Sequence, residues 1–206
     1  IAPLLNYSGA ESLNTLTATD LFYSELQQVK GLTVIPVNRV LAQMAQNRWN
    51  ELASPQDVLK LADQLGAQII LVAAVTEYNP YYPPIVGLAV QLFSAEATGT
   101  GSSTGIDPTE LQRSARPLPI EINLERKYWP KNQIQRIYNA RSEEIVSEVK
   151  AFAKQRGATS SPYGWEFYLR SQQDYLRFVF HQAICELLTK EAARVGRGPG
   201  TEAPEK

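Results

Sequence analysis

The feature that most constrains the fold is a continuous apolar run, AQIILVAAV, at residues 67–75. Such a run is typical of a strand whose sheet is covered on both faces, because none of its side chains can face water. A well-marked helix precedes it: Ser54 suits the N-cap, Pro55 the first turn, and Gly66 the C-terminal end. A second apolar segment, IVGLAVQLF, follows at 85–93. We therefore expect the 67–75 strand to lie in the centre of a sheet.

The N-terminal part of the chain alternates between apolar strands and amphipathic helices. Residues 1–5 read as a short strand, and a helix is predicted from 17 to 29. The β-branched segment LTVIPV at 32–37 predicts a further buried strand, and Asn38 can cap a second helix. Helices between strands indicate parallel neighbours with right-handed crossovers, whereas the two consecutive apolar strands can pair antiparallel. The predicted fold class is α/β, with a mixed sheet of four to five strands covered by helices.

The second half of the chain is predicted to be largely helical. Residues 94–117 are rich in Gly, Ser, Thr and Pro and predict a mobile loop, and alternating apolar positions at 118–129 predict a strand near an edge of the sheet. Helices are expected from 132 to 156 and from Ser161 to about 190. We predict one domain over 1–192, with a helical elaboration at 132–191 and a flexible tail at 193–206.

The last predicted helix carries a broad apolar stripe. Its members are Tyr168, Tyr175, Leu176, Val179, Phe180, Ala183, Ile184, Leu187 and Leu188. Burying each large side chain contributes roughly 1.5–3 kcal/mol, so this helix should be integral to the fold and not a surface addition. We expect it to lie across the sheet, with Cys185 buried and unreactive and with His181 at the boundary of the core.

The charge balance and the scarcity of reactive residues argue against several classes of function. The chain has 20 basic and 21 acidic residues, which argues against a nucleic-acid binder with a broad basic face. The segment GTGSSTG at 99–105 lacks the lysine of a phosphate-binding loop. His181 is the only histidine and lies one helical turn before Cys185, so an enzyme that uses His181 remains an alternative. Beyond that, we expect no catalytic residue, no metal and no cofactor.

Three tyrosines and three prolines crowd the junction between the two apolar strands, YNPYYPP at 78–84. Proline removes backbone donors and enforces extended backbone, so this connection should leave the sheet and project outward. Two interpretations are open: a rigid corner whose tyrosines pack on their own prolines, or a surface that docks a partner or stacks on a glycan. The residues that would form such a surface are Tyr78, Tyr81, Tyr82, Pro83 and Pro84.

Two stretches within roughly residues 1–95 match sequence patterns of a known protein family. The opening IAPLLNYSG fits V-A-V-L-P-F-x-N-x-S-G at Ile1, Pro3, Leu4, Asn6, Ser8 and Gly9. A second pattern, built around LGAD, is matched at Leu61, Ala62, Leu65, Gly66, Ala67, Val75 and Tyr78, with Gln68 in place of Asp. In both, the chain resembles a group of bacterial envelope lipoproteins. The group includes the periplasmic domain of the curli secretion channel CsgG, the N-terminal domain of TolB, and PelC of Pel polysaccharide export.

The resemblance implies a non-enzymatic lipoprotein domain in the bacterial periplasm, anchored to the outer membrane by a lipidated cysteine upstream of Ile1. It implies an accessory or assembly factor in export or envelope biogenesis. The expected partners are proteins of an envelope complex or further copies of the chain, without nucleic acid and with membrane contact only through the lipid anchor. The residues themselves leave two alternatives, a small-ligand or glycan-binding module at the 78–84 junction and an enzyme that uses His181.

Overall fold

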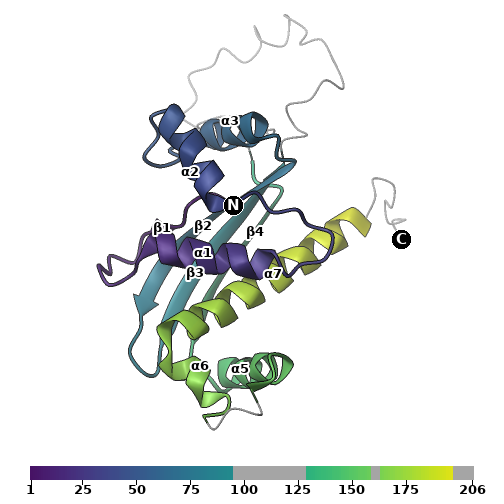
Figure 1. The fold of residues 1–206 in the computed structure, drawn as a ribbon. Coiled ribbons are helices and arrows are strands. Elements are labelled where there is room, and N and C mark those ends of the chain that lie inside the picture. The colour runs from purple at the N-terminus through teal and green to yellow at the C-terminus, as the bar shows by residue number, and fades with distance from the viewer. Residues whose placement is uncertain (95–128, 159–162, 197–206) are drawn as a thin grey trace, which may run out of the picture.

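The structure is a computed structural model that describes residues 1–94, 129–158 and 163–196. Its elements are β1 (Leu5–Asn6), α1 (Thr15–Leu26), α2 (Val37–Gln46), α3 (Pro55–Leu65), β2 (Ile69–Asn79), β3 (Ile85–Ser94), β4 (Asn132–Asn139), α5 (Glu143–Gln155), α6 (Glu166–Arg170) and α7 (Gln172–Gly196). Among these residues the strands form one sheet in the order β1-β2-β3-β4, with β1 parallel to β2 and the other neighbours antiparallel (Figure 1). The predicted mixed α/β sheet is confirmed, and β2, which contains most of the apolar run, is an interior strand.

Helices on both faces of the sheet divide the core in two. α1 and α7 cross one face (Figure 1), and the larger core includes Leu71, Ala73 and Val75 of β2 beneath them. On the other face, α2 and α3 form a smaller core with Ile70 and Phe93. Successive residues of a strand point to opposite faces, so a strand that serves both cores must be apolar throughout. This is the physical reason for the apolar run from Ile70 to Val75, whereas Ile69 at the start of the strand is 48% exposed.

A β-bulge at Thr76 reverses the in-and-out alternation of side chains at the end of β2. The pairing of β2 with β3 shifts register between Val75 and Glu77, and beyond the bulge Tyr78 packs against the larger core, as Val75 does. A Cβ atom added to Gly87 of β3 would lie 2.6 Å from Thr76 Oγ1. The close approach of the two strands at the bulge therefore requires glycine at this position.

The asparagine, serine and glycine of the opening motif form the turn that follows β1. Asn6 Oδ1 accepts hydrogen bonds from Ser8 N at 3.1 Å and from Ser8 Oγ at 2.6 Å, while Asn6 Nδ2 donates to Ala10 O at 2.9 Å. Gly9 has a φ of +71°, a left-handed conformation that side chains disfavour. The motif therefore closes a turn, which is a structural role.

The C-terminal helix α7 confirms the predicted stripe from Tyr175 to Leu187 and adds Phe178 to it, whereas Tyr168 lies on α6 and Leu188 is only partly buried. Its buried side chains are Tyr175, Leu176, Phe178, Val179, Phe180, Ala183, Ile184 and Leu187. Phe180 stacks on Phe22 of α1, with ring centroids 4.9 Å apart. α7 continues to Gly196, so the first residues of the predicted 193–206 tail are helical and the rest lie outside the described residues. No helix in the described part of the chain is apolar over a length that would cross a bilayer.

Four predicted elements differ from the structure. Residues 132–139, expected to be helical, form β4, because Ile134 and Tyr138 alternate into the core while β4 pairs with β3. Residues 32–36 form no strand, and Pro36 instead occupies the N-cap position of α2. The first strand is reduced to Leu5–Asn6. The last helix is interrupted at Ser171, whose hydroxyl accepts a hydrogen bond from Asp174 N at 3.3 Å and so begins α7 anew.

Three other predictions fall on residues that the structure does not describe. These are the mobile loop after Ser94, the edge strand at 118–128 and the helix start at 161–162.

Candidate functional site

The connection between β2 and β3 places two exposed tyrosines at one end of the sheet. Tyr81 and Tyr82 have 76% and 61% of their surface exposed. The backbone on either side is held in place: Asn79 Oδ1 accepts a hydrogen bond from Tyr81 N at 3.1 Å, and Pro84 O accepts one from Ala140 N at 3.0 Å. Both tyrosines therefore project from a braced turn and are not packed into the interior.

Arg170 of α6 lies against this turn. Its guanidinium carbon is 5.1 Å from the centre of the Tyr82 ring. A cation over an aromatic face is attracted by the ring quadrupole, which contributes about 0.5–1 kcal/mol at an exposed site. Figure 1 shows the turn and α6 at the same end of the molecule. The contact therefore links two segments that are far apart in the sequence.

Arg170 also lines a cavity of about 290 Å³, together with Tyr163, Glu166 and Phe167. Glu166 and Arg170 form an ion pair across 4.0 Å. Tyr163 and Phe167 have 73% and 45% of their surface exposed. Tyr81 and Tyr82 of the turn, with Tyr163, Phe167 and Arg170, are called the aromatic surface below.

Side chains on the opposite side of α6, together with Trp165 just before it, hold residues 163–170 against α5. Leu169 is buried, and the Tyr168 ring meets Phe152 of α5 edge-on, with centroids 5.3 Å apart. Lys150 Nζ of α5 lies 4.6 Å from the centre of the Trp165 ring. These contacts fix the α6 half of the aromatic surface to the body of the domain.

The structure separates the five residues that the sequence predicted as a binding surface. Tyr81 and Tyr82 are exposed, Pro83 is half-buried and Pro84 is buried. Tyr78 packs against the larger core, where burial raises the pKa of its hydroxyl. A partner can therefore reach only the exposed pair fully, and binding by that pair stays a prediction.

Sequence reasoning missed the part of the aromatic surface that comes from α6 and the residues before it. The signal available was the aromatic density of YGWEFY at 163–168. A pattern search assigns such a segment to the core stripe of a long helix. Only the break at Ser171 turns α6 away from α7, and only the tertiary fold brings it to Tyr82.

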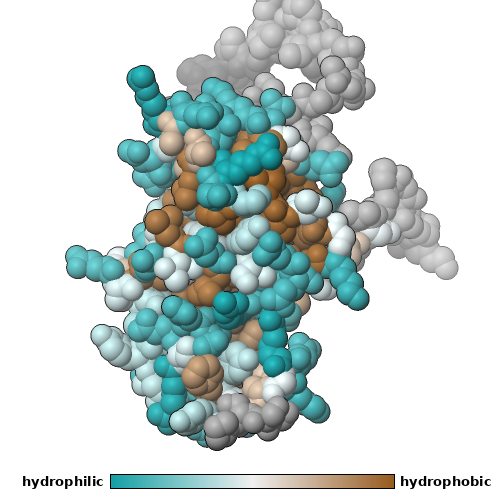
Figure 2. Space-filling view, in the orientation of Figure 1, coloured by the Kyte–Doolittle hydropathy of each residue, from teal (hydrophilic) through white to brown (hydrophobic). Residues whose placement is uncertain are grey.

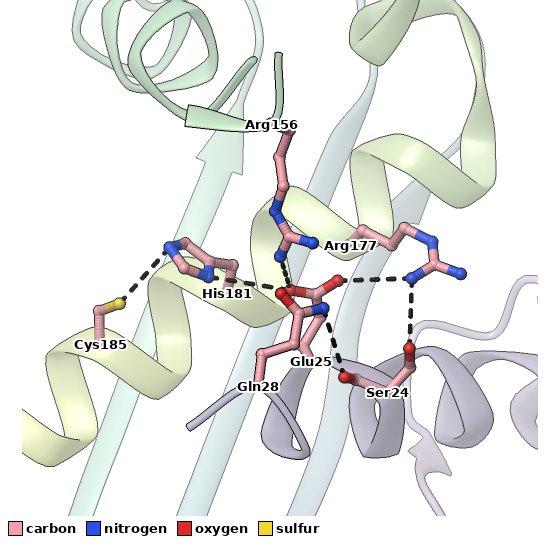
Figure 3. Close-up of polar contacts among 7 residues, drawn as sticks. All are labelled: Ser24, Glu25, Gln28, Arg156, Arg177, His181 and Cys185. Carbon is pink, nitrogen blue, oxygen red and sulfur yellow. Dashed lines mark hydrogen bonds and ion pairs between the residues drawn. The ribbon is translucent and has the colours of Figure 1, made fainter. Parts of the chain in front are cut away.

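A second candidate site, a cluster of polar side chains, lies between α1, α5 and α7 (Figure 3). It is called the polar cluster below. The Glu25 side chain of α1 is fully buried, and Arg156 at the end of α5 binds its Oε2. Arg177 Nη1 of α7 lies 3.4 Å from Glu25 Oε1, and His181 Nδ1 lies 3.8 Å from Oε2. A buried carboxylate is costly unless it is paired and hydrogen-bonded. The two arginines meet that requirement and tie three helices together.

Figure 3 also shows a line of groups from Glu25 through His181 to Cys185. His181 Nε2 lies 3.6 Å from Cys185 Sγ. A carboxylate, an imidazole and a thiol in this order are the groups of a cysteine nucleophile with its base. Here, however, partial burial raises the pKa of the Cys185 thiol and lowers the pKa of His181, despite the nearby Glu25. A reactive cysteine needs a lowered pKa, so this geometry favours a structural network.

Cys185 itself is exposed, so the prediction that it is buried is wrong. Its neighbours Ile184 and Leu187 point into the core. Each residue of a helix is rotated by about 100° from the last, which turns position 185 out of the stripe. His181 lies partly buried at the boundary of the core, as predicted.

The fold is that of an α/β domain with a four-stranded mixed sheet and helices on both faces. Comparisons with known proteins find structural neighbours of low similarity. No protein-family model and no curated protein matches the chain. Similar solved structures include the lipoprotein GNA1162 from Neisseria meningitidis, with 17% identity, a TM-score of 0.42, and coverage of 78% of this chain and 95% of that one. The LpoB C-terminal domain from Salmonella enterica has 20% identity, a TM-score of 0.38, and coverage of 45% and 67%.

A PelC dodecamer from Paraburkholderia phytofirmans is a further structural neighbour, with 17% identity and a TM-score of 0.28. The similarity covers 48% of this chain and 61% of that one. PelC is one of the proteins in the group that the opening motif resembles. At these TM-scores the comparisons assign neither a family nor a function to the chain.

Proposed function

We propose that this chain is a non-enzymatic domain of the bacterial periplasm that acts as an accessory or assembly factor in export or envelope biogenesis. In this proposal it binds a protein of an envelope complex through the aromatic surface. A lipidated cysteine upstream of Ile1 anchors it to the outer membrane. The location and the accessory role rest on the resemblance of residues 1–95 to envelope lipoproteins.

The observation that carries the binding role is the exposure of Tyr81 and Tyr82 on a braced turn. Tyrosine offers a large amphipathic area and has only two side-chain torsions to order, so it is enriched where proteins bind one another. Arg170 holds Tyr82 from one side, which further lowers the entropy lost on binding. A rigid corner would need no exposed rings, whereas a docking surface does.

The polar cluster supports a non-enzymatic role. Glu25 is engaged by Arg156 and Arg177, and the Cys185 thiol has a raised pKa. Neither group is poised as a base or a nucleophile in the way that covalent catalysis requires. The cluster instead stabilises the packing of α1, α5 and α7.

Photo-crosslinking in cells tests the proposed binding role. A photoreactive phenylalanine analogue would replace Tyr81 in the full-length protein, and the same analogue at Tyr7 would serve as the control. Tyr7 is a matched position because 67% of its surface is exposed and it lies in the turn after β1. We expect one discrete adduct with an envelope protein from position 81 and none from position 7. Equal labelling from both positions, or an adduct unaffected by Tyr82→Ala, would contradict the proposal.

A further inference from the structure

The aromatic surface suits one kind of protein segment. We propose that it binds a proline-rich stretch of its partner in the polyproline II conformation, with one proline ring in the cavity beside Phe167 and the next against Tyr82. This inference rests on the proposed function, because it names the chemistry of the protein that the same surface binds.

The kind of apolar surface at this end of the molecule favours a proline-rich segment. Figure 2 shows hydrophobic surface concentrated towards α2 and α3, whereas the α6 end is mostly hydrophilic with small separate hydrophobic areas. Tyr82 and Phe167 have 61% and 45% of their surface exposed, so their rings offer flat apolar faces to a partner. Aromatic-lined sites of this kind recognise proline-rich segments, whose preformed helix loses little entropy on binding.

The backbone of the turn is unsuited to another common mode of peptide recognition. Recognition by strand addition needs a row of free backbone N–H groups on the receiving chain. Three of the six residues from Asn79 to Pro84 are prolines, which have no N–H, and the N–H of Tyr81 is bonded to Asn79. This turn therefore cannot receive an added strand, and its side chains must provide the recognition.

The charges that line the cavity favour an uncharged segment. The cavity is lined by one carboxylate, Glu166, and one guanidinium, Arg170, which form an ion pair with each other. Their charges cancel, so the lining does not favour a strongly charged segment of either sign. An uncharged segment with many carbonyl acceptors fits better, because the hydroxyls of the exposed Tyr81 and Tyr82 can donate hydrogen bonds to it.

The size of the cavity favours a small apolar group. A cavity of about 290 Å³ lies at the lower limit of the roughly 300–1,000 Å³ that small-molecule sites occupy. It can hold one ring but would leave most of a larger ligand in solvent. A polyproline II segment repeats its face every three residues, or about 9 Å, so prolines three residues apart can contact the cavity and Tyr82, which Arg170 joins.

Titration with decaproline tests this inference, with a Gly-Ser peptide of equal length as the control probe. Binding would be followed by two-dimensional NMR of the whole domain. We expect decaproline to bind with a Kd below about 1 mM and the control peptide to show no binding. Tyr82→Ala and Phe167→Ala should each weaken binding about fivefold or more, and Tyr7→Ala should leave it unchanged. These side chains are exposed, so each variant should keep a cooperative melting transition, which shows that it still folds.

No binding at about 5 mM decaproline, or binding that survives both aromatic substitutions, would overturn the inference. A chito-oligosaccharide that binds in a Tyr82-dependent way while decaproline does not would overturn it in favour of a glycan site. If the crosslink from position 81 persists but decaproline neither binds nor competes, this inference fails and the proposed function stands. If decaproline binds at Tyr82 but no crosslink to an envelope protein forms, the proposed function fails and the peptide chemistry stands.

Discussion

The guanidinium of Arg156, the residue that follows α5, binds the buried carboxylate of Glu25 in α1. Arg177 and His181 of α7 approach the same carboxylate from a third helix. One acidic side chain therefore holds together elements from the beginning, the middle and the end of the chain. The stability of the domain should depend on this cluster more than on any surface ion pair.

Arg156→Met should lower the free energy of unfolding by about 2 kcal/mol, because Glu25 stays buried with less compensation. Breaking a buried pair typically costs about 3–5 kcal/mol, and the smaller value is expected because Arg177 still faces Glu25. Urea denaturation measures the change. Arg194→Met, which removes an exposed ion pair with Glu191, is the control and should leave the midpoint unchanged. Equal effects of the two substitutions would contradict the prediction.

The pH dependence of stability should report on His181. Its pKa is lowered from the ordinary value of 6.5, chiefly by burial, while Glu25 raises it and Arg156 lowers it. The unfolded chain therefore binds more protons below pH 6.5, so the free energy of unfolding falls as the pH drops through that range and is unaffected above it. His181→Gln should remove this component of the fall. Urea midpoints at about pH 7.5 and pH 5 measure it, and identical falls in both proteins would refute it.

Gly87→Ala should destabilise the domain by about 1–3 kcal/mol, because the added methyl group overpacks the bulge. The new Cβ would lie 2.6 Å from Thr76 Oγ1 and 3.0 Å from Glu77 N. Thermal melting measures the loss. Adding Thr76→Ala to the Gly87→Ala variant should recover part of it, because the closest contact is removed. A double variant less stable than the sum of the two single changes would argue against a steric cause.

Cys185 should react with iodoacetamide in the folded protein, because its side chain is exposed. The reaction should be slow at neutral pH, since the pKa of the thiol is raised above its ordinary value of 9.0 and only the thiolate reacts. A pH–rate profile should therefore have its midpoint above 9.0. A midpoint below that value would show that His181 activates the thiol, and it would revive the alternative of an enzyme.

Phe180→Ala should cost about 3–5 kcal/mol, because the ring is fully buried against Phe22 and its loss leaves a cavity. Phe167→Ala is the matched control, with the same atoms removed from a side chain that is 45% exposed, and it should cost less than about 1 kcal/mol. Denaturant unfolding of both variants measures the difference. Similar losses would mean that α7 is not integral to the core.

Local patterns in the sequence determined much of the fold. The continuous apolar run predicted an interior strand, and Ser54, Pro55 and Gly66 marked both ends of α3, where Ser54 Oγ accepts from Asp57 N at 3.2 Å. The spacing of apolar residues predicted the buried stripe of α7. Each of these signals depends on residues close together in the chain, so a sequence pattern contains them completely.

Tertiary structure decided the rest. Residues 132–139 contain apolar side chains at both helical and strand spacing, and pairing with β3 selects the strand. Residues 32–36 have strand propensity but no strand beside them among the described residues, so they stay irregular. Glu25 finds its partners on α5 and α7, and Tyr82 meets Arg170 of α6. Both candidate clusters join residues distant in sequence, and such contacts arise only when packing of the core fixes the helices around the sheet.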